Sequence, residues 1–272
     1  MVIKKNRKII KITLVICFIL LSVFFIIFLL IPLPSVSLYP QKMVSCNILD
    51  RKGTLLRTVL SSKYSTASWV NLDRISPHMV DATVAAEDKR FYSHFGIDIL
   101  ATARAFVQDV REGRIVSGGS TITQQLAGLA YDIPRGSLKC KMLEAIYALK
   151  IDFKYSKNEI MELYLNRAPY GNQTYGIEGA SLLYFGKPAE QLSLAESAFL
   201  ASIPRSPGIY DPYRNFEETK KEQFLILKRM YRNGRISERS YKQAMEEPLL
   251  VIPMTDTFLA PHFCDFIQKE IS

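Results

Sequence analysis

The sequence has few cysteines, and they show no pairing pattern. Cys17, Cys46, Cys140 and Cys264 form no Cys-x-x-Cys pair, and none lies with a histidine at the spacing of zinc ligands. We therefore expect neither a structural zinc site nor a disulfide scaffold, and we interpret the cysteines as packing residues. No Gly-Lys-Ser/Thr element occurs either, which excludes a Walker-type phosphate loop.

Outside its first eleven residues the chain has no block of basic residues. The net charge is +9, and the basic residues at positions 4, 5, 7, 8 and 11 supply five of these charges. The rest of the chain carries +4, from 30 Lys and Arg against 26 Asp and Glu. We expect no nucleic-acid partner, because so mild an excess suits anionic lipid or phosphate groups at least as well.

A long apolar run follows the basic tail. Residues 12–31 contain no charged side chain, and about 20 apolar residues are needed for a helix to cross the hydrocarbon core. A cleaved signal peptide has a shorter apolar region that ends in small residues, whereas Ile-Pro-Leu-Pro follows here. We expect an uncleaved transmembrane anchor at 12–33. The tail at 1–11 would then be cytoplasmic, with the later residues on the outer side of the cytoplasmic (inner) membrane.

The remaining chain is expected to be mainly α-helical. Two short strands flank the turn signal at 50–53, which indicates a small β-hairpin within an extended connector at 34–71. Apolar residues recur at helical spacing from 72 to 246, which we interpret as one domain. The segment 247–272 is less periodic and is expected to be a linker or the start of a further domain.

Individual helices can be placed by their caps and apolar faces. Ser193 and Glu196 form a capping-box pattern that opens an apolar helix. A helix at 137–153 would place Leu138, Met142, Ala145, Ile146 and Leu149 on one apolar side. A helix at 157–165 would turn Ile160, Leu163 and Tyr164 inward.

The first chemical candidate is the pair Glu87-Asp88, which ends an apolar helix and precedes Phe91, Tyr92 and His94. Shielding by aromatic rings would raise the pKa of a carboxyl group toward neutrality, as a general base requires. The alternative is a solvated, charged helix end, which is the usual meaning of Glu-Asp-Lys-Arg. His94 taken alone is more often a structural hydrogen-bonding residue than a ligand.

The second candidate is the stretch 117–125. Its paired glycines let backbone amides approach a ligand closely, and Ser120-Thr121 opens a helix whose free N–H groups favour phosphate. The alternative is an ordinary loop with a Ser or Thr N-cap. A third set, Lys139, Lys141 and Glu144, combines cations for a phosphate with a second carboxylate, and a surface ion pair is its alternative.

In order along the chain, these stretches resemble the motifs of the glycosyltransferase domain of class A penicillin-binding proteins (glycosyltransferase family 51). Glu-Asp-x-x-Phe-x-x-His-x-Gly is matched at 87–96, and Gly-x-Ser-Thr-Ile-Thr-Gln-Gln at 118–125. Arg-Lys-x-x-Glu is matched at 140–144, except that cysteine replaces the arginine. Lys-x-x-Ile-x-Glu-x-Tyr-Leu-Asn is matched at 157–166, and a later block at 175–187 also agrees.

The resemblance covers about residues 72–212, and matches at 166–171, 203–207 and 260–263 are closest to the penicillin-binding protein 1C type. That type usually continues into a transpeptidase domain. The sequence contains no Ser-x-x-Lys and no Lys-Thr-Gly, the elements that covalent penicillin binding needs. We therefore expect a truncated or split-gene product that does not bind penicillin covalently and depends on a separate transpeptidase.

The resemblance implies a lysozyme-like helical fold that acts on lipid II, a disaccharide-peptide on undecaprenyl pyrophosphate. It implies that Glu87 is the general base for the acceptor 4-hydroxyl as that oxygen attacks the donor's anomeric carbon. Lipid II would be polymerised into β-1,4-linked peptidoglycan strands by an inverting single displacement that releases undecaprenyl pyrophosphate. This leaving group needs charge neutralisation rather than an acid. No cofactor or resident metal is expected to be required, although a divalent cation (Mg or Mn) would fit.

The other site assignments follow from the same resemblance. Glu144 is the second catalytic carboxylate and orients the donor's pyrophosphate–sugar region. The expected substrate-binding residues are Asp88, Arg104, Ser120, Thr121, Gln124, Gln125, Lys139 and Lys141. The expected partners are lipid II, the growing glycan strand and the membrane. Two alternatives are a lytic enzyme on the same kind of fold and an inactive or regulatory membrane-tethered remnant of a bifunctional protein.

Overall fold

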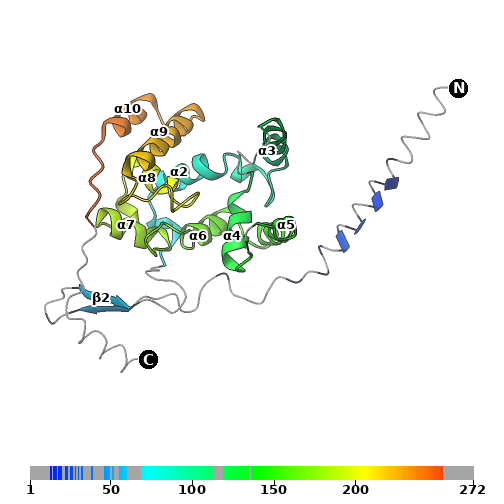
Figure 1. Ribbon diagram of the computed structural model, residues 1–272, viewed down its shortest axis with the longest axis horizontal. Coiled ribbons are helices and arrows are strands. Elements are labelled where there is room, and N and C mark those ends of the chain that lie inside the picture. The colour runs from blue at the N-terminus through cyan, green and yellow to red at the C-terminus, as the bar shows by residue number, and fades with distance from the viewer. Residues whose placement is uncertain are drawn as a thin grey trace. The chain divides into compact units, whose positions relative to one another are not determined.

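Helices dominate the part of the chain that the computed structural model describes. That part comprises residues 69–112, 119–134 and 136–253, two strands, and isolated positions between 13 and 51. The strands β1 (Cys46–Leu49) and β2 (Leu55–Val59) pair antiparallel, with a register irregularity between Ile48 and Leu49. The expected mainly helical fold is confirmed (Figure 1).

The chain divides into two units, residues 1–36 and 37–272. The anchor expected at 12–33 lies in the first unit, where the structure describes only isolated residues. Across the described residues, no helix has the length and apolar character that a membrane span needs. The anchor and the segment boundaries therefore stay predictions, and the tail at 1–11 and residues 254–272 lie outside the described part.

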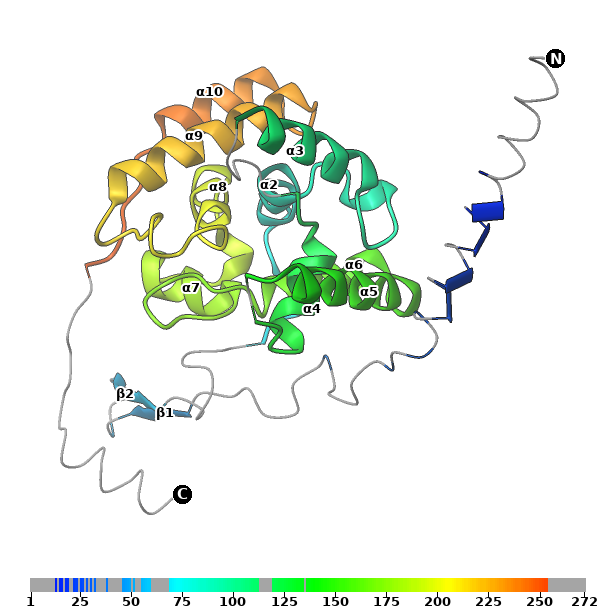
Figure 2. The ribbon, with the colours of Figure 1, turned by 45° about the vertical axis from the view of Figure 1, so that its right-hand side comes forward.

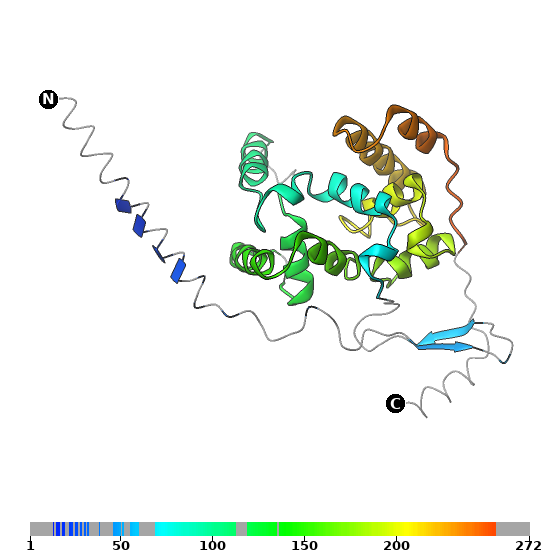
Figure 3. The same cartoon turned by 180° about the vertical axis from the view of Figure 1, so that it is seen from behind.

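The second unit contains two groups of packed helices. Helix α8 packs against α2 and α9, and α10 lies along α9 (Figure 2), whereas α4 packs against α5 and α6, as the view from behind also shows (Figure 3). The bounds are α2 (Pro77–Glu87), α3 (Ile99–Glu112), α4 (Ile122–Ala130), α5 (Leu138–Lys154), α6 (Lys157–Leu165), α7 (Ile177–Phe185), α8 (Leu194–Ser202), α9 (Phe216–Arg232) and α10 (Glu238–Glu246). Short 3-10 turns lie at Leu72–Arg74, Phe91–Ser93 and Ala189–Gln191.

Helix α8 is the centre of the core. All its residues except Glu196 are buried, as expected for a helix that is apolar on every side. Its start confirms the capping box: the Ser193 hydroxyl accepts from the Glu196 amide, and the Glu196 carboxylate accepts from the Ser193 amide. The two exchanged bonds satisfy amides that would otherwise lack partners at the helix start.

Helix α5 begins as expected, with the Ser137 hydroxyl accepting from the Cys140 amide at 3.1 Å. Its apolar side was predicted wrongly, because Leu138 is 80% exposed and Met142 is 59% exposed. The buried residues of α5 are Glu144, Ile146, Ala148 and Ile151. The first turns of α5 border an open cleft instead of the core, so their inner side carries polar residues. On α6, by contrast, the inward positions of Ile160, Leu163 and Tyr164 are confirmed.

Gly96 brings the end of the first motif against α5. Its φ is +61°, and a Cβ at this position would lie 2.6 Å from the Ala148 carbonyl oxygen, so only glycine fits. The Gly96 amide donates to Asp152 Oδ2 on α5 at 2.7 Å, and its carbonyl accepts from the Thr121 hydroxyl at 2.5 Å. Three segments that carry candidate site residues therefore meet at one backbone position.

Candidate active site

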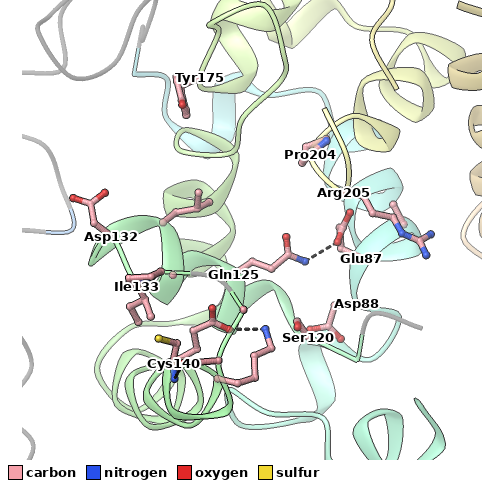
Figure 4. A pocket seen from close by; sticks show the side chains of 18 of the residues that line it. Glu87, Asp88, Ser120, Gln125, Asp132, Ile133, Cys140, Tyr175, Pro204 and Arg205 are labelled. Carbon is pink, nitrogen blue, oxygen red and sulfur yellow. Dashed lines mark hydrogen bonds and ion pairs between the residues drawn. The ribbon is translucent and has the colours of Figure 1, made fainter. Parts of the chain in front are cut away.

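A cleft of about 880 Å³ collects residues from the segments that the sequence singled out (Figure 4). The expected site residues that line it are Glu87, Asp88, Ser120, Gln125, Lys141 and Glu144. Of the other four, Lys139 is exposed and does not line the cleft. Arg104 is also exposed and borders two neighbouring pockets. Thr121 and Gln124 are buried at the start of α4.

Glu87 is the last residue of α2 and faces the cleft. Its Oε2 accepts a hydrogen bond from Gln125 Nε2 at 2.6 Å. Its Oε1 is buried and has no hydrogen-bond partner among the described residues. Burial raises the pKa of the Glu87 carboxyl, against the opposing effects of the Gln125 hydrogen bond and of Arg205 and Arg229. The raised pKa and the free acceptor oxygen are what a general base needs.

Asp88 is buried and already bound. Its carboxylate oxygens lie 2.9 and 3.0 Å from His94 Nε2, and Oδ2 accepts from the Ile122 amide at 3.2 Å. The carboxylate of Asp88 thus occupies the start of α4, where free amides were expected to hold a phosphate. For the Ile122 amide the expectation of a bound phosphate was wrong, because the Asp88 carboxylate of the first motif is the anion that this amide binds.

Thr121 and Gln124 form the cap of α4. The Thr121 hydroxyl accepts from the Gln124 amide at 3.1 Å, and Gln124 Oε1 accepts from the Thr121 amide at 2.9 Å. The N-cap alternative therefore describes Thr121. Thr121 also borders a small pocket of about 80 Å³ whose lining includes Glu87 and Ser120. The contacts of Thr121 and Gln124 to a substrate stay predictions.

Glu144 has a different setting from Glu87. Its carboxylate is buried and accepts from Lys141 Nζ at 2.6 Å. A Cβ at Gly128 of α4 would lie only 3.4 Å from Glu144 Oε1, so α4 passes close to this carboxylate. Cys140, in the first turn of α5, is half-buried and also lines the cleft. Lys141 and Glu144 therefore form an ion pair in the cleft wall, in which the carboxylate is buried and the lysine side chain is 52% exposed.

Two cleft arginines were missed by the sequence reasoning. Arg205 follows α8 and Arg229 lies on α9, and their guanidinium groups lie 3.6 and 3.2 Å from the buried carboxylate of Glu222. Figure 4 shows Arg205 beside Glu87. The match at 203–207 contained Arg205 without assigning it a role. Arg229 carried no signal, because charged residues on an amphipathic helix usually face solvent.

The described residues contain one group with the geometry for a metal ion. Ligand atoms of Asp88, His94 and Asp98 lie within 4.8 Å of one another. Asp98 accepts from the Arg90 guanidinium, including Nε at 2.8 Å, which holds the pKa of Asp98 below its usual value. Asp88 is bound by His94 and Ile122. Because internal donors already satisfy both carboxylates, this group fits a structural role better than a metal site.

The arrangement can deprotonate a hydroxyl group and hold an anion. One carboxylate has a free acceptor oxygen, the second is paired with Lys141, and Arg205 and Arg229 add positive charge. Helices hold these groups in one cleft, except for Arg205, which lies in the turn after α8. The fold and the site define a helical domain whose cleft is suited to acid–base chemistry and to holding an anionic group.

Comparison with known proteins assigns the family. Residues 52–231 match the family described as Transglycosylase, and the chain belongs to this family. It is 40% identical over 224 residues to penicillin-binding protein 1A of Aquifex aeolicus (strain VF5), covering 82% of this chain and 30% of that protein. It is 41% identical over 206 residues to penicillin-binding protein 2D of Bacillus subtilis (strain 168), covering 75% of this chain and 30% of that protein.

The chain therefore spans about 30% of the length of these two relatives. A 2.6 Å crystal structure of penicillin-binding protein 1A from Haemophilus influenzae also matches, with a TM-score of 0.49 and 21% identity, covering 82% of this chain and 23% of that chain. The expected membership of the penicillin-binding protein glycosyltransferase family is confirmed. The nearer resemblance to the 1C type stays a prediction.

Proposed function

We propose that this chain is a peptidoglycan glycosyltransferase that polymerises lipid II into β-1,4-linked glycan strands. The observation that carries the proposal is Glu87, which lines the cleft of a chain in the transglycosylase family and has a buried Oε1 without a hydrogen-bond partner among the described residues. The relatives are named penicillin-binding proteins. A lysozyme-like arrangement of the helices is part of the same proposal.

The proposed reaction is one displacement. Glu87 takes the proton of the acceptor 4-hydroxyl while that oxygen bonds to the donor's anomeric carbon. The bond from this carbon to the pyrophosphate breaks on the opposite side, which inverts the linkage, and its electron pair leaves with the undecaprenyl pyrophosphate. Lys141 is placed to neutralise that charge, and Glu144 orients both Lys141 and the donor. No cofactor is required, although Mg²⁺ or Mn²⁺ can accompany the pyrophosphate.

The proposal includes a membrane setting. The apolar run at 12–31 and the basic residues before it support a single anchor with a cytoplasmic N-terminus and a catalytic domain on the outer side. A substrate and an enzyme that share one membrane meet more often than two soluble molecules.

Labelled lipid II incubated with the purified chain tests the proposal. We expect polymer from the wild type and a loss of about 10²–10⁴-fold in Glu87→Gln, because the amide keeps the shape but cannot take the proton. Binding of lipid II should largely survive.

Glu217→Gln, an exposed position in the first turn of α9, is the control and should keep full activity. Cleaved glycan would indicate a lytic enzyme instead, and no product would indicate an inactive remnant. Near-normal polymer from Glu87→Gln would overturn the role of Glu87.

A further inference from the structure

Three side chains from three helices form a hydrogen-bonded chain that ends at Glu87. Tyr164 on α6 is 1% exposed, and its hydroxyl donates to Gln125 Oε1 at 3.2 Å. The other end of the same amide, Nε2 of Gln125 on α4, donates to Glu87 Oε2 at 2.6 Å. Figure 4 shows the bond between Gln125 and Glu87, which both line the cleft. Tyr164 itself does not line the cleft.

The chemistry of the two ends fixes which way the amide points. An ionised carboxylate only accepts hydrogen bonds, so it needs the NH₂ end of Gln125. In the reversed amide, an oxygen would face the Glu87 carboxylate, and only a protonated Glu87 could then bond to it. A tyrosine hydroxyl can donate to the carbonyl end, and this bond holds the amide in the orientation that suits the ionised base.

We propose that Tyr164 is a positioning residue: its hydroxyl holds the Gln125 amide so that the NH₂ group faces Glu87. This inference rests on the proposed function of Glu87 as the base. Through Gln125, Tyr164 keeps a hydrogen-bond donor against Oε2 of Glu87. With Oε2 bound by Gln125, Oε1 is left as the one acceptor for the proton of the attacking hydroxyl.

Other charged groups also act on Glu87, and they set the background for a titration. Arg205 and Arg229 lower the pKa of the Glu87 carboxyl, whereas burial and the negative charge of Glu222 raise it. Burial raises the pKa of the Tyr170 phenol, and the negative charge of Glu87 raises it further. None of these groups is changed by a substitution at Tyr164. A shift in that variant would therefore report on the Gln125 amide.

The test is the pH dependence of polymerisation in Tyr164→Phe. Without the hydroxyl the amide can reverse, which removes a hydrogen bond to the charged carboxylate and raises the pKa of Glu87. We expect the rising limb of the pH–rate profile to move up by about one pH unit, because the charged carboxylate loses a hydrogen bond that stabilises it. Activity should fall about tenfold on the acidic side and recover at alkaline pH, with KM little changed.

Tyr213→Phe is the control, because the Tyr213 hydroxyl donates to the Leu183 carbonyl and this residue lies outside the cleft lining. Its profile should match the wild type. In a Gln125→Met background, adding Tyr164→Phe should produce no further shift, since the amide through which Tyr164 acts is gone. An equal loss of rate at every pH, or an additional shift in that background, would reduce Tyr164 to a packing residue.

A second measurement does not need turnover. The carboxyl stretch of Glu87 can be followed by infrared difference spectroscopy of each protein against its Glu87→Gln counterpart. We expect the Glu87 carboxyl to titrate at higher pH in Tyr164→Phe than in the wild type, and an unmoved titration would overturn the inference. A wild type without polymerase activity would overturn the proposed function instead, so the two failures can be told apart.

Discussion

Glu87 and Glu144 are both buried carboxylates of one cleft, and their neighbours give them different chemistry. Glu144 accepts a hydrogen bond from Lys141 Nζ at 2.6 Å, which holds its carboxylate in place. Glu87 receives one bond from a neutral amide and keeps one oxygen free. The two residues are of the same type, so it is their surroundings that give each carboxylate its own role. Glu87 is thus the group suited to move a proton.

Cys140 is the residue at which this chain departs from the expected motif, and it lines the cleft next to Lys141. A guanidinium group at this position would bind a pyrophosphate through paired hydrogen bonds. We predict that Cys140→Arg lowers the KM for lipid II by about tenfold, the equivalent of one charge-assisted bond, with little change in kcat. Initial rates over a range of lipid II concentrations give both constants.

Cys140→Ala is the matched control, since it changes the side chain without adding charge, and its KM should equal that of the wild type. An unchanged or higher KM in Cys140→Arg would show that this position does not face the anion. The cations Arg205 and Arg229 would then be the better candidates for anion binding in the cleft.

Most of the carboxylate and amide positions could be predicted from the sequence, because each lies in a contiguous motif. Arg205 and Arg229 could not, because they reach Glu87 only through the packing of α8 and α9 against α2. The cap role of Thr121 and Gln124 could not be predicted for the same reason, because it depends on the fold. The motif identified them as polar residues near the site, but only the fold shows that their atoms are used in the cap of α4.

At the scale of elements, Asp152 is the residue that joins the candidate motifs. Its Oδ2 accepts from the Gly96 amide at 2.7 Å, the Thr123 hydroxyl at 3.3 Å and Lys157 Nζ at 2.5 Å. These donors come from the segment after α2, from α4 and from α6, and Asp152 lies on the helix that carries Glu144. One buried carboxylate thus helps to fix the relative positions of these helices.

We predict that Asp152→Asn lowers the free energy of unfolding by roughly 3–5 kcal/mol, the usual cost of leaving one partner of a buried ion pair alone. Both side chains are largely buried, at 4% exposed for Asp152 and 19% for Lys157. Urea unfolding measures the change. Polymerisation should fall in parallel, because the elements that hold the site shift together.

Glu218→Gln provides the matched comparison. Glu218 and Lys221 form an ion pair of similar length, 2.6 Å, but their side chains are 57% and 66% exposed. Exposed pairs contribute little, so this variant should stay within about 0.5 kcal/mol of the wild type. Equal effects at the two sites would show that Asp152 is not a structural junction.

Helix positions were easier to predict than helix faces. The starts of α5, α6 and α8 follow from local caps, since each N-cap hydroxyl accepts from an amide three residues along the chain. The exposure of Leu138 and Met142 depends instead on what lies opposite α5. Apolar spacing shows which residues share a side, but not whether that side meets a core or a cleft.

At the scale of the whole molecule, keeping Glu87 buried and ready to act as a base lowers the stability of the fold. The pKa of Glu87 in the fold lies above its ordinary value of 4.5 because burial disfavours the charged form. From about pH 4.5 up through the raised pKa, the folded protein holds this proton more tightly than the unfolded chain does. The contribution of Glu87 to stability therefore falls as the pH rises through that window. At neutral pH the fold carries a charge that function requires and stability does not favour.

We predict that Glu87→Gln, though inactive, melts at a higher temperature than the wild type at about pH 8, and that the difference shrinks toward zero below about pH 4.5. The neutral amide removes the buried charge and leaves the volume unchanged. Thermal unfolding across this pH range measures the difference. Glu238→Gln is the control, because a hydrogen bond from Lys242 lowers the pKa of the exposed Glu238. Its effect should be small and of opposite sign.

The opposite result for Glu87→Gln would contradict the assignment. If this variant is less stable than the wild type, and the deficit is larger at pH 8 than at pH 4, then the charge of Glu87 stabilises the fold. Glu87 would then not be a base with a raised pKa.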